Sequence, residues 1–167
     1  AADAAGLMIL YHRLLPQYLP THQGSLMPNV QKTLQYFADH ETGYKTCLLT
    51  GNTMMGAFTK LRHYGIDQYF DSRYSACGEL SEDRCELART AWQRLYLLDH
   101  AVTPDDIIII GDTPNDIRCA QAIKARSLIV LAGSTHSEAE LAACRPWRLI
   151  DRLPDDPQEL VALLDEN

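Results

Sequence analysis

Residues 107–116 read IIIIGDTPND, and they carry the clearest structural signal in the chain. Four consecutive isoleucines are typical of a strand that is buried on both faces, as in a parallel sheet. Gly111 ends the run. Thr113 and Asp116 have the spacing of a helix capping box, and Pro114 suits the first helical position. The stretch therefore predicts a strand, a tight turn and a helix.

Two carboxylates lie where this predicted strand ends. Asp112 follows it directly, and Asp116 comes one helical turn later, with the polar residues Thr113 and Asn115 between them. Open α/β sheets bind ligands at the carboxyl ends of their strands, and carboxylate oxygens suit Mg²⁺. The pair therefore predicts a magnesium site. For Asp116 an ordinary role is equally open, because acidic residues in the first turn of a helix favour the helix dipole.

Predicted strands and helices alternate through most of the chain. Apolar spacing predicts helices at about residues 4–15, from Pro28 to Thr42, around Met55–Leu61, at about residues 82–98, after residue 113, from Ser137 and from Asp156. Strands are expected at residues 46–50, 69–76, 107–110, 127–131 and 147–150. The alternation predicts an α/β fold, with a three-layer Rossmann-like parallel sheet that has helices on both faces.

Composition narrows the class of protein. The 167 residues suit one ordinary domain, and a net charge of −7 argues against nucleic acid or an anionic membrane as the main partner. A small anionic substrate remains possible if a bound cation and a few hydrogen-bond donors interact with it. No apolar run is long enough to span a membrane. The five cysteines are odd in number and form no C-x-x-C pair, so we expect free thiols in a reducing, cytoplasmic compartment.

Thr50, Gly51 and Asn52 follow another short apolar run and precede another predicted helix. A hydroxyl and backbone N–H groups at such a corner can hold phosphate oxygens with the help of the helix dipole. A plain turn, in which Thr50 and Asn52 form local caps, explains the same three residues.

Arg84 lies in the first turn of the helix predicted at residues 82–98. A positive charge there opposes the helix dipole, which points to an anionic partner. The ordinary alternative is a surface arginine that pairs with Glu82 or Asp83.

Taken together, these residues resemble the haloacid dehalogenase-like hydrolases, and their phosphatase branch best. Residues 49–52, 82–84 and 110–120 resemble the second, third and fourth motifs of that family. The fourth is the most specific, whereas the third departs from the family in having Arg84 where lysine is usual. The resemblance covers residues 26–167, which we expect to form the α/β core. Residues 1–25 resemble the end of a helical cap with its linker.

The resemblance implies a chemistry for these positions. In the family, an aspartate nucleophile attacks a phosphate ester, and a Mg²⁺ ion bridges carboxylates and phosphate. By analogy, Asp112 is a direct metal ligand and Asp116 binds or orients the metal's shell. Thr50, with the backbone of residues 51–52, holds phosphate oxygens, and Arg84 offsets negative charge. The implied activity is that of a magnesium-dependent phosphatase acting on a small phosphorylated metabolite.

The family's first motif, D-x-D-x-T after an apolar strand, has no match in this chain. Asp3 follows only two alanines and has no acidic partner two residues later. The nucleophile and the first central strand are therefore missing, and we expect a fragment of a longer hydrolase that cannot turn over by itself. The alternative is a non-catalytic module that binds phosphate or a partner. A dehalogenase in the strict sense is disfavoured, because that branch needs no metal and the pair of Asp112 and Asp116 suggests one. A nicotinamide-binding domain is disfavoured because no G-x-G-x-x-G motif follows any predicted strand.

The missing strand raises a question about the fold. In the family it lies between the strands that end at Thr50 and at Gly111. Residues 7–11 could fill the gap, the two flanking strands could pair directly, or the chain could be marginally stable. The apolar period of residues 7–18 is helical, so we expect direct pairing in the folded chain and marginal stability in solution.

Overall fold

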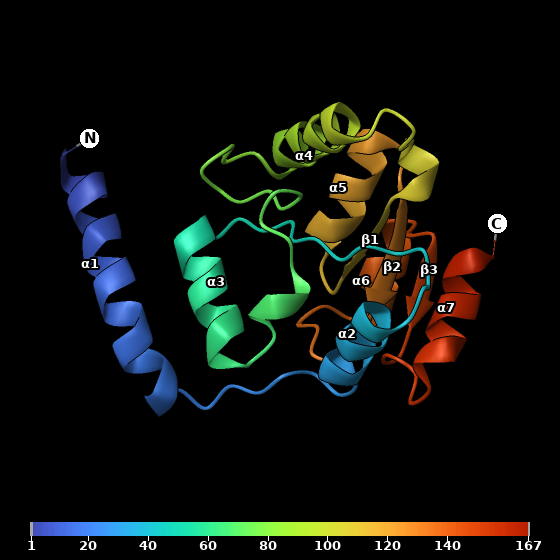
Figure 1. Ribbon diagram of the computed structural model, residues 1–167, viewed down its shortest axis with the longest axis horizontal. Coiled ribbons are helices and arrows are strands. Elements are labelled where there is room, and N and C mark those ends of the chain that lie inside the picture. The colour runs from blue at the N-terminus through green and yellow to red at the C-terminus, as the bar shows by residue number, and fades with distance from the viewer. Residues whose placement is uncertain (1, 167) are drawn as a thin grey trace.

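The computed structural model describes residues 2–166, and strands and helices alternate from residue 108 onward, whereas the part before it is helical with irregular connections (Figure 1). The helices are α1 (Ala2–Tyr18), α2 (Val30–Asp39), α3 (Met54–His63), α4 (Arg84–Leu98), α5 (Pro114–Ile123), α6 (Glu138–Ala143) and α7 (Pro157–Asp165). The strands are β1 (Ile108–Gly111), β2 (Arg126–Val130) and β3 (Arg148–Ile150). None of the helices formed by these residues has the length and apolarity that a membrane crossing needs.

The three strands form a parallel sheet in the order β1-β2-β3. α5 connects β1 to β2, and α6 connects β2 to β3. On one face, Leu128 packs with α2 and α7. On the other, Ile129 packs with Ile117 of α5 and Leu141 of α6. The predicted fold class, a parallel α/β sheet with helices on both faces, is confirmed.

The turn from β1 into α5 follows the local sequence signals. The side chain of Thr113 and that of Asp116 form the predicted capping box, and Pro114 occupies the first turn. The capping box of Ser137 and Glu140 at α6 is also confirmed. These signals act over four residues, so they do not depend on the rest of the fold.

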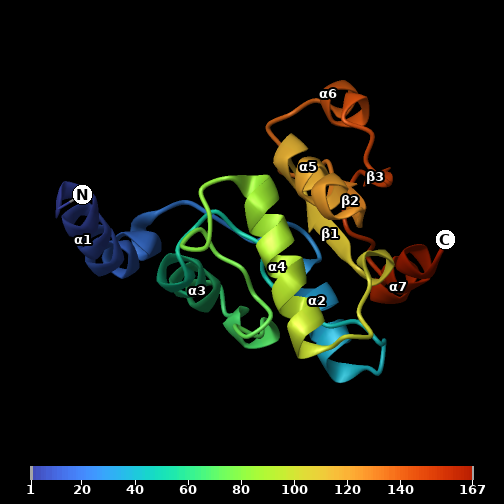
Figure 2. The ribbon, with the colours of Figure 1, turned by 90° about the horizontal axis from the view of Figure 1, so that it is seen from above.

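The N-terminal segment is helical, as its apolar period predicts. α1 packs on α3, and together they lie at the opposite end of the molecule from α7 (Figures 1 and 2). His12 Nε2 lies 2.7 Å from Thr53 Oγ1 at the start of α3. Leu7 and Ile9 point away and are 64% and 71% exposed. The division into a cap remnant at 1–25 and a core at 26–167 stays a prediction.

Two predicted strands, at residues 46–50 and 69–76, do not form. They are reduced to one parallel bridge between Leu49 and Ala76, in which Ala76 N donates to Leu48 O at 2.7 Å and Thr50 N donates to Ala76 O at 3.0 Å. Asp67–Tyr69 is a short 3₁₀ turn instead. The local pattern predicted extended chain, but a strand also needs a ladder of hydrogen bonds, and only one neighbour is present for a short stretch.

The expectation that the two flanking segments pair directly is wrong. Among residues 2–166, no backbone hydrogen bond joins residues 47–51 to β1. Leu49 and Ile109 nevertheless pack on the same apolar cluster from α4 and α5, which includes Ala88 and Cys119. The two segments therefore lie beside the same cluster without pairing, and we call the unpaired region between Leu49 and β1 the strand slot.

The backbone of both borders is oriented so that alternate residues face the strand slot. Arg126 N donates to Ile107 O, so the backbone N–H and C=O groups of residues 107, 109 and 111 point toward β2. Those of residues 108 and 110 point toward the strand slot. By the same alternation, Leu49 faces the slot across from β1. Ile110 was predicted to be buried, but it is 43% exposed, because no strand formed by the described residues neighbours this edge of β1.

Candidate functional site

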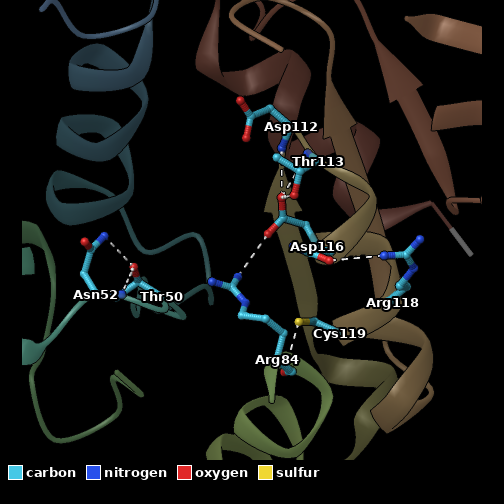
Figure 3. A network of polar contacts seen from close by, with 9 residues as sticks. Thr50, Asn52, Arg84, Asp112, Thr113, Asp116, Arg118 and Cys119 are labelled. Atoms are coloured by element: carbon cyan, nitrogen blue, oxygen red, sulfur yellow. Dashed lines mark hydrogen bonds and ion pairs between the residues drawn. The ribbon is translucent and has the colours of Figure 1, made fainter. Parts of the chain in front are cut away.

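Three stretches that are distant in sequence meet at the carboxyl end of β1. They are the loop at residues 50–52, the first turn of α4 and the turn from β1 into α5 (Figure 3). The guanidinium of Arg84 lies between the other two. Its Nη2 is 3.5 Å from Asp116 Oδ1, and a Cβ built on Gly51 would lie 3.2 Å from its Nη1. The fold therefore brings the predicted site residues into one neighbourhood.

Arg84 does not pair with its sequence neighbours. Asp83 caps α4, with Oδ1 accepting a hydrogen bond from Glu86 N at 2.9 Å, and the ion pair of Arg84 is with Asp116. The ordinary alternative of a surface pair with Glu82 or Asp83 is therefore wrong. The Nε of Arg84 is buried and has no hydrogen-bond partner among the described residues. A buried donor without an acceptor is costly, and an anionic ligand at this place would satisfy it.

Asp116 is engaged in holding the turn. Its Oδ2 accepts hydrogen bonds from Asp112 N at 3.2 Å, Thr113 N at 3.0 Å and Thr113 Oγ1 at 2.8 Å. A Cβ on Gly111 would lie 2.3 Å from Asp116 Cγ, so the glycine makes room for this carboxylate. The structural role that the sequence left open for Asp116 is therefore present, and Oδ1 adds the contact with Arg84.

The carboxylate of Asp112 points away from Asp116 and from Arg84 (Figure 3). Burial, and then the negative charge of Asp116, raise the pKa of Asp112 above its usual range, and His136 acts in the opposite direction. The backbone around it is fixed, because Ser134 Oγ donates to Asp112 O at 2.5 Å. Burial and a like charge destabilise the ionised form of this carboxylate, and a bound cation would stabilise that form.

The two aspartates fit Mg²⁺ only in part. Asp112 offers a carboxylate that makes no hydrogen bond within the described residues, whereas Asp116 already uses both oxygens. No cluster of three or more His, Cys, Asp or Glu residues suited to a metal occurs in the part of the chain that the structure describes. Magnesium commonly takes one or two carboxylates and completes its shell with water and phosphate. The pair therefore suits such an open shell and not a closed protein site.

The loop at residues 50–52 is organised as a local turn. Thr50 Oγ1 accepts from both the backbone N and the side-chain amide of Asn52 at 3.1 Å. The start of α3 is also satisfied, because Glu79 Oε1 accepts from Met54 N at 2.7 Å. The N–H of Gly51 and the hydroxyl proton of Thr50 remain as the donors with which this corner can meet a phosphate oxygen.

Gly78 holds this loop in place and predicts a measurable effect. Its N donates to Asn52 O at 2.8 Å, and an added Cβ would lie 2.3 Å from Gly51 O. Because backbone cannot move as easily as a side chain, Gly78→Ala is expected to lower the free energy of unfolding by about 1–3 kcal/mol in urea titration. Gly6→Ala is the control, since nothing lies within 4 Å of that position in α1. Equal stability of both variants would contradict the contact.

Sequence reasoning missed the residues that support the site. Ser134 and His136 lie in the loop after β2, and Glu79 and Thr53 cap α3. Residues 134–137 are polar and come shortly after the strand predicted at residues 127–131. Because parallel strands end at the same edge of a sheet, this position could have indicated that they lie near Asp112. Glu79 has no such signal, because its contact with α3 spans 25 residues of irregular chain.

Residues 85–156 match a family model described as HAD-hydrolase-like. The matched region contains both aspartates and begins one residue after Arg84. A comparison with curated proteins gives no match.

Several solved structures share the fold. A haloacid dehalogenase-like family protein from Streptococcus pneumoniae has a TM-score of 0.65 and 20% identity, over 84% of this chain and 60% of its own. A predicted phosphoglycolate phosphatase from Haemophilus somnus has a TM-score of 0.66 and 20% identity, over 92% and 61%. CbbY from Rhodobacter sphaeroides, solved in complex with phosphate, has a TM-score of 0.68 and 17% identity, over 89% and 63%.

These structures are longer than the chain, which spans about three fifths of each. At this level of identity they establish the fold, and the family model matches the region that carries the strand-turn-helix signal with both aspartates. The chain therefore has the fold of these structures, and its residues 85–156 are similar to the haloacid dehalogenase-like hydrolase family.

Proposed function

We propose that the longer protein of which this chain is the α/β part is a magnesium-dependent phosphatase that cleaves small phosphorylated metabolites. The observation that carries the proposal is the position of Arg84. Its guanidinium lies between Gly51 and Asp116, and its buried Nε has no partner among the described residues. A phosphate group is the anion that matches a planar, multi-donor cation beside a backbone corner.

Each residue has a role in this proposal. Thr50 and the Gly51 N–H would hold phosphate oxygens, and Arg84 would balance their charge. Asp112 would hold Mg²⁺, with Asp116 orienting the turn that presents it. The ion would offset negative charge on the phosphoryl group. Transfer of a phosphoryl group depends mainly on positive charge and hydrogen-bond donors held in fixed positions around it.

The chain alone lacks a nucleophile in this scheme. We infer that the nucleophile belongs to an additional strand in the strand slot, because that slot opens at its carboxyl end between Thr50 and Asp112. Leu49 and Ile109 border it, and unpaired backbone groups of β1 face it. A parallel strand there would gain hydrogen bonds on both sides and cover Ile110. The chain as it stands would therefore bind phosphate without turnover.

A non-catalytic phosphate-binding module is the second candidate. The contact that favours it is the use of both Asp116 oxygens inside the protein, which leaves one free carboxylate for a metal. The two candidates differ in what the strand slot does. In the phosphatase it receives a catalytic strand, and in the binding module it stays open or receives a strand without carboxylates.

Addition of the strand tests the proposal. A synthetic peptide with a five-residue apolar run followed by D-x-D-x-T would be mixed with the chain, and hydrolysis of p-nitrophenyl phosphate would be measured with Mg²⁺. We expect hydrolysis to rise at least about 100-fold over the chain alone. A peptide with both aspartates changed to asparagine is the control. Equal binding of both peptides with no hydrolysis would support the binding module instead.

The two aspartates are expected to differ in metal affinity. Asp112→Asn removes the free carboxylate and should weaken Mg²⁺ binding by about tenfold or more in calorimetry, whereas Asp116→Asn should weaken it less. Asp116→Asn should instead lower thermal stability, because the capping contacts with Thr113 are lost. The reverse order of metal affinities would refute the assignment.

A further inference from the structure

Two thiols lie at the contact between α4 and α5, directly behind the site. Cys85 is the second residue of α4, and Cys119 lies in the middle of α5. Cys119 Sγ donates to Arg84 O at 3.2 Å, and Cys85 Sγ donates to Arg118 O at 3.9 Å. Each thiol thus contacts the carbonyl of the residue that precedes the other cysteine. This reciprocal arrangement places both cysteines at the contact between α4 and α5 (the Cys119 contact is drawn in Figure 3).

The two thiols differ in access to solvent. Cys119 is 0% exposed, whereas Cys85 is partly exposed. Burial raises the pKa of the Cys119 thiol, so it forms a thiolate less readily than an open cysteine does. An oxidant from solution therefore meets Cys85 first, and Cys119 is the thiol at the same helix contact.

We propose that Cys85 and Cys119 are a redox-active pair, which peroxide converts to a disulfide that ties the first turn of α4 to α5. In the first step the Cys85 sulfur attacks one oxygen of hydrogen peroxide, the O–O bond breaks and water leaves, so that Cys85 becomes a sulfenic acid. In the second step the Cys119 sulfur attacks Cys85, the S–O bond breaks and a second water leaves. Two thiols are oxidised and one peroxide is reduced to two waters.

The remaining cysteines are placed differently. Cys77 is buried and its Sγ lies 3.8 Å from Met54 Sδ, whereas Cys47 and Cys144 lie on other parts of the fold. Among the described residues, the thiol of none of these three cysteines contacts the backbone next to another cysteine, as the thiols of Cys85 and Cys119 do. Formation of a disulfide is therefore expected to be selective for the pair between α4 and α5.

The disulfide would act on the site through Arg84, which precedes Cys85 and whose carbonyl contacts Cys119. A disulfide between this turn and α5 would hold the Arg84 guanidinium next to Asp116. The Asp116 carboxylate would then compete with an added anion for the guanidinium. This consequence rests on the proposed phosphate site, but formation of the disulfide does not.

Peroxide treatment of the reduced chain tests the pair. The intact mass should fall by about 2 Da, and trypsin should release Cys85–Arg89 linked to Cys119–Lys124. The oxidised chain should melt about 5 °C higher or more, because the cross-link closes a long loop. Its affinity for inorganic phosphate should fall several-fold and recover with dithiothreitol.

Three variants make the test specific. Cys85→Ser and Cys119→Ala should each abolish the linked peptide, whereas Cys144→Ser should leave it unchanged. Linkage of other cysteines, oxidation of Cys85 to sulfinic acid without linkage, or an unchanged melting temperature would overturn the inference. A chain that links these peptides but never binds phosphate would refute the proposed function and leave the redox pair standing.

Discussion

Arg84→Ala is expected to lower the affinity of the chain for inorganic phosphate by about 100-fold, whereas Arg84→Lys should stay within about tenfold of the parent. The guanidinium is the only cationic group that lies between Gly51 and Asp116 among the labelled site residues (Figure 3). Removing it leaves Asp116 without its ion pair, so phosphate would then meet uncompensated carboxylates. Titration calorimetry with phosphate in Mg²⁺ buffer measures both variants.

Arg118→Ala is the matched control for Arg84. Arg118 lies on α5 close to the site, but its Nη1 reaches Asn115 Oδ1 at 3.3 Å and it points away from Arg84 (Figure 3). It changes the net charge by the same amount, so an effect of overall charge would appear in both variants. A neutral Arg84→Ala would mean that the positive charge of the site must be sought elsewhere.

Hydrogen exchange in β1 is expected to alternate strongly between neighbouring amides. The amides of Ile109 and Gly111 face β2 and should be protected, whereas those of Ile108 and Ile110 face the strand slot and should exchange at least about 1,000-fold faster. The physical reason is that a parallel strand points alternate N–H groups to opposite edges, and this edge has no partner. Exchange followed by nuclear magnetic resonance resolves each residue.

β2 supplies the control for this alternation. It pairs on both sides, so the amides of Leu128, which faces β1, and Ile129, which faces β3, should both be protected. Uniform and strong protection of β1, together with a sharp cooperative melt, would contradict an open strand slot and the marginal stability that the sequence predicts. Addition of the D-x-D-x-T peptide should slow the exchange of Ile108 and Ile110 alone.

The sequence was most informative where a signal is complete within a few residues. The isoleucine run, Gly111 and the capping box of Thr113 and Asp116 predicted β1, its turn and α5, because each contact of that turn spans at most four positions. The period of residues 7–18 predicted α1 for the same reason. The resemblance of residues 110–120 to the hydrolase motif then indicated the family that the comparison supports.

The sequence was misleading where an element depends on a distant neighbour. Residues 46–50 have the composition of a buried strand, yet one bridge to Ala76 is all that the fold provides. Ile110 is an apolar residue in an apolar run, yet it is exposed. The run of isoleucines predicts a strand but does not indicate whether another strand lies beside it. Burial of a strand is a property of the sheet around it.

Local sequence signals were therefore enough to predict the helices, the three strands of the sheet and the strand-turn-helix that presents Asp112. The folded chain was needed to see that Arg84 pairs with Asp116 across 32 positions and that Asp116 is committed to its own turn. It was also needed to see that one edge of β1 is unpaired among residues 2–166. The physical reason is one of range. Caps and periods are satisfied by atoms a few residues apart, whereas ion pairs, ladders and burial require partners that folding brings from elsewhere in the chain.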